Sequence, residues 1–166
     1  MSNDQQQAQR AEVTTPSDRE IRVERVFDAP RERVFAVYTD PGLIPEWCGP
    51  RGGTTIVDRM EVRAGGAWRF VYREAEGSET AFRGTYREVT PPERIVQTFE
   101  WEGMPGHVSV ETVTFEDVEG GRTKVTTVST FDTTKERDGM LASGMEGGLN
   151  ETYERLDEVL ARLAEA

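Results

Sequence analysis

Six short segments between Thr54 and Phe131 constrain the fold more than any other feature, because apolar and polar residues alternate in them with a period of two. Glycine, proline and acidic turn residues separate the segments at Gly65-Gly66, 76–78, Pro91-Pro92, 103–106 and Gly120-Gly121. These connections are too short for a crossover helix, so the segments are expected to form a mostly antiparallel sheet. The six segments are 54–62, 66–74, 80–89, 94–101, 107–117 and 122–131.

A long amphipathic helix is expected after the sheet, over residues 133–166. Thr133 and Glu136 fit a capping box at its start. A helix with one apolar stripe and a sheet with one apolar face are expected to cover each other. The stripe comprises Leu141, Met145, Leu149, Leu156, Leu160 and Leu163.

The N-terminal part of the chain divides into a tail and the start of the domain. Residues 1–19 are polar and rich in glutamine, which predicts a disordered tail before a single domain over residues 20–166. Residues 20–27 read as a first strand, and two short helices follow, with Asp28 and Asp40 as their caps. The expected class is α+β, in the order β-α-α-β6-α.

Charge and composition exclude several classes of partner. A formal net charge of −11 repels the phosphates of nucleic acids and of anionic membranes. No apolar run suggests a signal peptide or a membrane span, and the single cysteine permits no internal disulfide. We therefore expect a cytoplasmic protein, monomeric or weakly homodimeric, that binds neither nucleic acid nor membrane.

Four glycines interrupt the first half of the expected long helix, where each costs roughly 1 kcal/mol relative to alanine. They are Gly139, Gly144, Gly147 and Gly148. Close packing of helix on sheet, or a kink near Gly139, is one interpretation. Space for a ligand between helix and sheet is the other.

Cys48 and His107 are candidates for catalytic or metal-binding roles. A nucleophilic cysteine needs a base that is itself oriented by a third group, and a zinc site needs more thiolates or imidazoles than this chain offers at a recognisable spacing. We therefore expect Cys48 to be a small filler in the wall of a pocket. His107 stands at the entrance of a strand and is expected to be a solvated or capping group.

Glu111 shares one face of its segment with Ser109, Val113 and Phe115. If this face is the concave one, the carboxylate lies among apolar neighbours and its pKa is raised. If the register shifts by one residue, Glu111 is an ordinary exposed charge. The pattern favours the inward orientation.

Three stretches give the chain a resemblance to a known superfamily: DAPRERVFAVYTDPGLIPEWCGP, GMPGHVSVETVTFED and DGMLASGMEGGLNETYERLDEVL. Over about residues 21–163 the chain resembles the START-like, helix-grip superfamily, also called SRPBCC. Within it, the chain resembles bacterial proteins related to the C-terminal domain of the activator of the 90-kDa heat-shock chaperone ATPase. The resemblance implies a curved antiparallel sheet that grips a long C-terminal helix, with a cavity between them. It also implies binding, transport or transformation of hydrophobic small molecules, as in polyketide cyclases and proteins that sequester antibiotics.

Three functions follow from these patterns. The first is binding or sequestration of a hydrophobic or aromatic small molecule, such as a polyketide-type metabolite, without catalytic residues, metal or cofactor. The second is a cyclase or aromatase-like enzyme in which Glu111, Tyr86 or His107 moves protons. The third is an interaction module of the chaperone-activator kind. The residues expected to bind the ligand are Trp47, Phe70, Phe82, Tyr86, Phe99, Trp101, Glu111, Val113, Met145 and Gly148.

Overall fold

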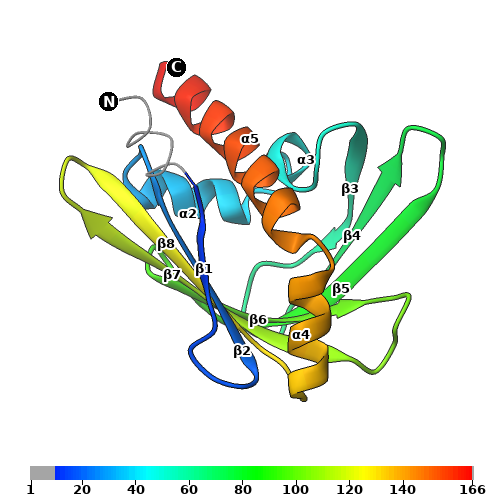
Figure 1. The fold of residues 1–166 in the computed structure, drawn as a ribbon. Coiled ribbons are helices and arrows are strands. Elements are labelled where there is room, and N and C mark those ends of the chain that lie inside the picture. The colour runs from blue at the N-terminus through cyan, green and yellow to red at the C-terminus, as the bar shows by residue number, and fades with distance from the viewer. Residues whose placement is uncertain (1–9, 166) are drawn as a thin grey trace.

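The computed structural model describes residues 10–165, which form one antiparallel sheet and four helices (Figure 1). The eight strands lie in the order β1-β2-β8-β7-β6-β5-β4-β3. The strands are β1 (Glu12–Thr14), β2 (Glu20–Phe27), β3 (Gly53–Met60), β4 (Ala67–Glu74), β5 (Glu79–Thr90), β6 (Arg94–Trp101), β7 (Val108–Val118) and β8 (Arg122–Thr130).

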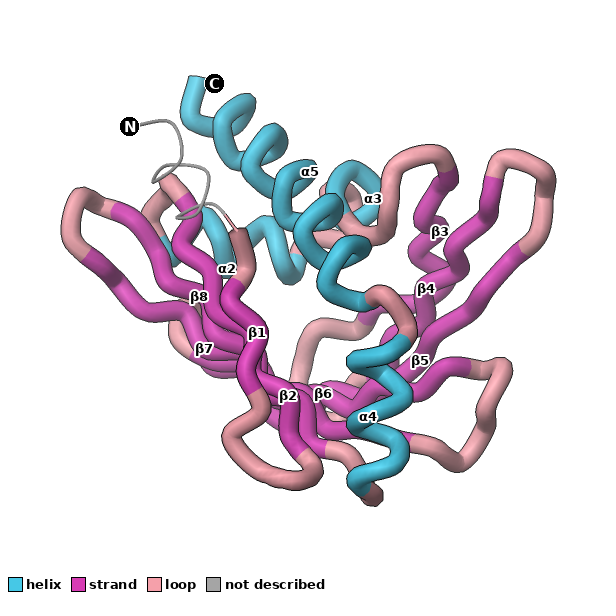
Figure 2. Tube along the Cα trace, viewed as in Figure 1, coloured by secondary structure: helices cyan, strands magenta, loops and turns pink. Residues whose placement is uncertain are grey.

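The antiparallel sheet confirms the prediction from periodicity. The bounds of β2 and β6 are those predicted, and the other five expected strands differ by at most two residues at either end. The sheet is strongly bent, and its concave side faces the helices (Figures 1 and 2). The expected α+β helix-grip fold is therefore confirmed.

Part of the expected disordered tail is ordered, so that prediction is wrong for residues 10–19. Strand β1 pairs antiparallel with β2, with Val13 opposite Val23. The buried Ala11 donates its backbone N–H to Asn150 Oδ1 at 2.9 Å. A three-residue strand is too short to show a period, so its pairing with β2 could not be seen in the sequence. The remainder of the expected tail, residues 1–9, lies outside the described residues.

Two short helices, α2 (Arg31–Thr39) and α3 (Ile44–Trp47), follow β2. The expected capping by Asp28 is wrong, because Pro30 holds the N-cap position of α2 and no side chain caps it. Asp40 shapes the turn before α3 instead of capping the helix itself. Its carboxylate accepts the Gly42 N–H at 2.8 Å, and Leu43 is the N-cap of α3.

The expected single C-terminal helix is two helices, α4 (Thr134–Ala142) and α5 (Met145–Glu165). The capping box is confirmed, since Thr133 Oγ1 accepts the Glu136 N–H at 3.1 Å. The break lies at Gly144, whose φ of +82° is a left-handed conformation that favours glycine. It removes Leu141 from the expected apolar stripe, and the Leu141 side chain is 37% exposed.

Helix α5 lies across the concave side of the sheet and buries its C-terminal half (Figures 1 and 2). Leu156 and Leu160 of the predicted stripe are almost completely buried, and Leu163 is half-buried. Burial of such a side chain stabilises a fold by roughly 1.5–3 kcal/mol. The buried partners from the sheet and from α2 include Ile21, Phe27, Val34, Val37, Phe115 and Val125.

Two arginines fix the position of α5. The guanidinium of buried Arg25 on β2 donates to both carboxylate oxygens of Asp157, at 2.7 and 2.6 Å, and lies over the Phe27 ring. Arg155 donates to the carbonyl oxygens at the C-terminal end of α3, including Gly49 O at 2.7 Å. Both sets of contacts join α5 to elements more than a hundred residues earlier in the chain.

We expect Leu156→Ala to lower the free energy of unfolding by roughly 2–5 kcal/mol, because the substitution leaves a cavity in the packed core. Leu141→Ala, on the exposed side of α4, should change it by less than about 0.5 kcal/mol. Urea denaturation of both variants measures the difference. Equal effects would mean that α5 does not pack on the sheet as described.

Candidate functional site

The concave face of the sheet has a packed end and an open end. The packed end comprises β2, β7 and β8 beneath the C-terminal half of α5, where Phe27 and Tyr153 meet edge to face with their ring centroids 5.1 Å apart. The open end comprises β4, β5 and β6, opposite α4 and the start of α5 (Figure 2). Many side chains on this open end are only half-buried, although they face the interior of the bent sheet.

Four aromatic side chains form a connected cluster on the open end, which we call the aromatic cluster: Trp68, Phe70, Phe82 and Phe99. Phe82 and Phe99 are stacked with centroids 5.3 Å apart, and Trp68 lies 4.9 Å from Phe70 and 6.0 Å from Phe99. Phe70 and Phe82 are opposite each other in the β4–β5 pairing. Trp68 is 4% exposed, whereas the three phenylalanines are half-buried. The cluster therefore offers ring surface that the protein itself does not cover.

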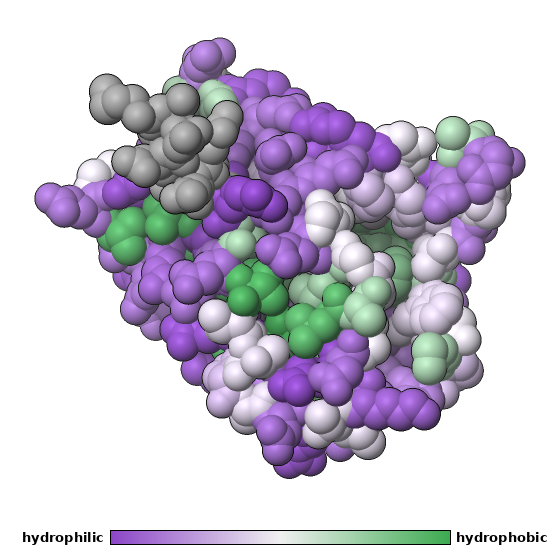
Figure 3. All heavy atoms as spheres, viewed as in Figure 1, coloured by the Kyte–Doolittle hydropathy of each residue, from purple (hydrophilic) through white to green (hydrophobic). Residues whose placement is uncertain are grey.

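A recess separates the start of α5 from strands β3 to β5, and Figure 3 shows pale green and white surface on its walls. Met145 and Leu149 of α5 are half-buried there. A Cβ atom added to Gly147 or Gly148 would meet no atom within 4 Å. These glycines therefore do not serve close packing of helix on sheet, so that part of the interpretation is wrong, whereas the helix does break among the glycines, at Gly144.

A row of polar side chains crosses the concave face between the aromatic cluster and the packed end. In the strand register Tyr86, Gln97, Glu111 and Ser129 stand side by side on β5, β6, β7 and β8. We call these four residues the polar row. Gln97 Nε2 donates to Glu111 Oε1 at 3.0 Å. The inward orientation of Glu111 is therefore the one that the structure adopts.

Burial raises the pKa of Glu111, and hydrogen bonds from Gln97 and Ser129 act in the opposite direction. Desolvation disfavours the charged form of a carboxyl group, which gives the direction of the shift. Burial, with a smaller contribution from Cys48, raises the pKa of Tyr86 to about 12. Tyr86 is the buried member of the polar row, and Gln97, Glu111 and Ser129 are half-buried.

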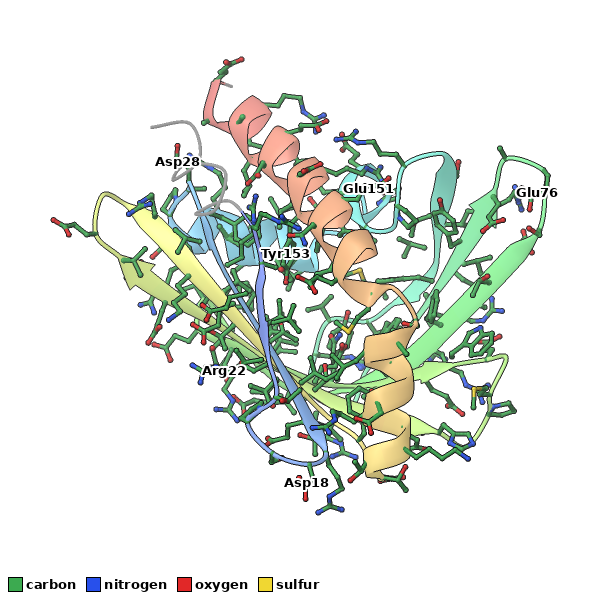
Figure 4. The ribbon with its side chains drawn as sticks, in the orientation of Figure 1. Asp18, Arg22, Asp28, Glu76, Glu151 and Tyr153 are labelled. Carbon is green, nitrogen blue, oxygen red and sulfur yellow. The ribbon has the colours of Figure 1, made fainter. Side chains whose placement is uncertain are left out.

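Tyr153 covers the polar row from α5 and lies between this helix and the strands (Figure 4). Burial raises its pKa, while hydrogen bonds with Tyr38 and Thr127 lower it. The nearby Glu111 raises it further. A polar network therefore extends from α2 through α5 to the middle of the sheet.

Comparison with known proteins identifies the family. The family described as "Activator of Hsp90 ATPase homolog 1-like protein" matches residues 28–161. The chain belongs to this family. As a member, it has the START-like helix-grip fold that the sequence resemblance implied.

Several solved structures are similar to this chain. A crystal structure of a Rhodobacter sphaeroides protein is 28% identical, with a TM-score of 0.87 over 92% of this chain and 99% of that one. A solution structure of an Arthrobacter aurescens protein is 25% identical, with a TM-score of 0.82 over 91% of each chain. The AHSA1 protein of Silicibacter pomeroyi, 22% identical with a TM-score of 0.68 over 86% of this chain and 97% of that one, shares the fold. The search of curated proteins gave no match.

Most of the predicted ligand-binding residues of this family member lie at the open end or in the polar row, but some do not. Phe70, Phe82 and Phe99 belong to the aromatic cluster, Met145 and Gly148 lie at the start of α5, and Tyr86 and Glu111 belong to the polar row. Trp101 lies at the rim, opposite Phe82 in the register, and is 43% exposed.

Trp47 and Val113 lie in the packed end instead. Trp47 is buried against Tyr38, with centroids 4.8 Å apart. Val113 is buried and pairs with Thr127. Neither side chain belongs to the aromatic cluster or the polar row, and their role in ligand binding stays a prediction.

Trp68 is a member of the aromatic cluster that the list of expected site residues omitted. Its indole Nε1 is buried without a hydrogen-bond partner. The alternation Trp68, Phe70 and Tyr72 placed it on the same face as Phe70, which is the signal that could have included it.

Cys48 ends helix α3 as its C-cap, and burial raises the pKa of its thiol to about 12. A thiol with this pKa is protonated at neutral pH and is a poor nucleophile. Its carbonyl oxygen accepts the Thr55 hydroxyl at 2.7 Å. These contacts support the interpretation of Cys48 as a structural side chain.

His107 stands outside the recess, at the start of β7. Its Nδ1 contacts the Glu136 carboxylate of α4, and the imidazole is half exposed. This position does not bring it to the polar row, so the proton-transfer role considered for His107 has no support in the geometry. Within residues 10–165, no three His, Cys, Asp or Glu side chains gather as a metal site would require. No helix in that range has the length and apolar character to cross a membrane.

Replacement of Cys48 by alanine or serine should leave the affinity for a hydrophobic fluorescent probe within a few-fold of the wild-type value, because the thiol has no chemical role. Fluorescence titration of the two variants measures this. A loss of binding by orders of magnitude in a folded variant would refute the structural role.

The raised pKa of Glu111 predicts a pH-dependent contribution to stability. A carboxyl group whose pKa is higher in the folded state favours folding below its unfolded pKa, about 4.5, and loses that contribution as the pH rises through the folded value. The wild type should therefore lose stability relative to Glu111→Gln as the pH rises above about 4.5. Denaturation of both proteins from pH 4 to 8 tests this, and a constant difference would contradict the buried carboxyl group.

Proposed function

We propose that this protein binds or sequesters a hydrophobic, aromatic small molecule in the recess between α5 and strands β3 to β5. A polyketide-type metabolite or an antibiotic of that kind has the required chemistry. The half-buried phenylalanine rings of the aromatic cluster are the observation that carries the proposal. Binding sites for small molecules are concave and mostly apolar, with a few polar groups that orient the ligand.

The residues around the recess supply each of these features. Phe70, Phe82 and Phe99 offer ring faces for stacking, and Met145 offers an adaptable apolar surface. The polar row borders the aromatic cluster, since Phe99 is two residues from Gln97 on the same face of β6. A ligand that stacks on the cluster would therefore meet hydrogen-bonding groups at its inner end.

Two depressions elsewhere fit this role less well. One, of about 400 Å³, lies on the convex face and includes Arg69, Arg83 and Glu100. The other, of about 420 Å³, includes Arg22, Arg94 and Lys124. Ion pairs occupy these side chains, as between Arg83 and Glu100 and between Lys124 and Glu24. Neither depression includes the half-buried phenylalanines of the aromatic cluster.

The second candidate function is a cyclase or aromatase-like enzyme in the same recess. Burial raises the pKa of Glu111, and this favours the enzyme, because a carboxyl group with a raised pKa is a stronger base than an ordinary carboxylate. Incubation with polyketide substrates decides between the two functions. Turnover that disappears in Glu111→Gln would indicate the enzyme, and saturable binding without product would indicate the binder. A chaperone-related role, a cytoplasmic location and a monomeric or weakly dimeric state stay predictions.

Gly148→Leu provides the sharpest test of the recess. A Cβ at this position meets no atom within 4 Å, and leucine is a better helix former than glycine, so the variant should fold with unchanged or higher stability. The new side chain would occupy space that the ligand needs. We expect the affinity for a hydrophobic fluorescent probe to fall by at least about tenfold, which corresponds to 1.4 kcal/mol.

Gly147→Leu is the matched control, because Gly147 is the preceding residue of α5, is exposed and is equally free of close neighbours. It should leave the probe affinity unchanged. Calorimetric melting of both variants separates loss of binding from loss of fold. Unchanged affinity in a folded Gly148→Leu would remove the start of α5 from the binding site.

A further inference from the structure

We propose that the ligand of this recess is an aromatic molecule that carries a basic amine, and that the amine pairs with the Glu111 carboxylate. This inference rests on the proposed binding function and specifies its ligand class. It starts from a carboxylate that stands inside the molecule without a cationic partner.

Glu111 has two hydrogen-bond donors but no ion pair with a basic side chain within residues 10–165. The donors are the Gln97 amide, at 3.0 Å, and the Ser129 hydroxyl. A carboxylate offers about four acceptor positions, so two donors leave part of its capacity unused. A buried carboxylate is costly unless a positive charge compensates it.

The buried arginine on the concave face does not serve as this partner. Arg25 is held by Asp157 through two short hydrogen bonds. Ile21 of β2 is opposite Ser129, which is in turn opposite Glu111. Arg25 lies four residues beyond Ile21 on β2, and therefore far along the sheet from Glu111. The other titratable group that packs against Glu111 is the Tyr153 hydroxyl, which carries no positive charge at neutral pH.

The position of Glu111 makes its carboxylate reachable from the recess. It is half-buried, and so are its hydrogen-bond partners Gln97 and Ser129. Next to Gln97 on the same face of β6 is Phe99, a member of the aromatic cluster. A ring stacked on the cluster with an aminomethyl group directed along the sheet would bring the ammonium toward Glu111.

Two further properties favour a cation over a neutral or anionic group. The faces of aromatic rings attract cations, so an ammonium group that lies over a ring face of the aromatic cluster is favoured. The formal net charge of −11 raises the local concentration of cations and repels anions. Both effects favour a cationic ligand, as the carboxylate without a cationic partner does.

Three probes of similar shape test the inference: naphthylmethylamine, naphthylmethanol and naphthoic acid, titrated at neutral pH by calorimetry. We expect the amine to bind at least about tenfold more tightly than the alcohol, and the acid to bind most weakly. Glu111→Gln should remove the preference for the amine and keep the affinity for the alcohol. Glu111→Asp, which retains the charge, should retain part of the preference.

Glu116→Gln is the control, because it removes one negative charge from an exposed position on the same strand. The preference for the amine should survive in it. If Glu116→Gln abolishes the preference as Glu111→Gln does, general electrostatic attraction explains it and the inference is wrong. Equal affinity of amine and alcohol for the wild type would also overturn it, although binding itself would stand. Failure of all three probes to bind would refute the proposed function as well.

Discussion

The burial of only the C-terminal half of α5 is the constraint on which the rest of the structure depends. Leu156 and Leu160 hold this half against the sheet, and the ion pair between Arg25 and Asp157 fixes its position and direction. The first half of the helix begins after the break at Gly144 and carries two glycines without close neighbours. A helix held at one end thus leaves room above the other end of a bent sheet.

The division of the sheet into a packed and an open end gives each set of aromatic residues a different role. Phe27 and Phe115 fill the core beneath α5 and α2, where they contact Tyr153 and Phe35. The residues of the aromatic cluster, on β4 to β6, contact one another, and its three phenylalanines are only half-buried. Aromatic residues of the same kind therefore stabilise the fold at one end and suit ligand binding at the other.

The polar row lies where these two ends meet, so it affects both the stability of the fold and the selectivity for a ligand. Its hydrogen bonds keep Glu111 within the fold despite the cost of burial. The same carboxylate is the group that would distinguish one aromatic ligand from another. Selectivity from one buried polar group in an apolar site is physically reasonable, because a ligand that leaves this group unpaired loses much of its affinity.

The sequence by itself determined seven of the eight described strands and which of their side chains share a face. Strict alternation places Phe82, Phe99 and Glu111 on the concave face, and the same local pattern marks the strand bounds to within two residues. The turns are equally local, since glycine and proline act through backbone geometry.

Tertiary structure alone decided what each face meets. Trp47 and Trp101 share an aromatic character in the sequence, yet one is buried against Tyr38 and the other is 43% exposed. The pairing of β1 and the partner of Arg25 likewise depend on residues distant in the chain. Periodicity records which side chains share a face, but the depth of each depends on long-range packing that no local pattern contains.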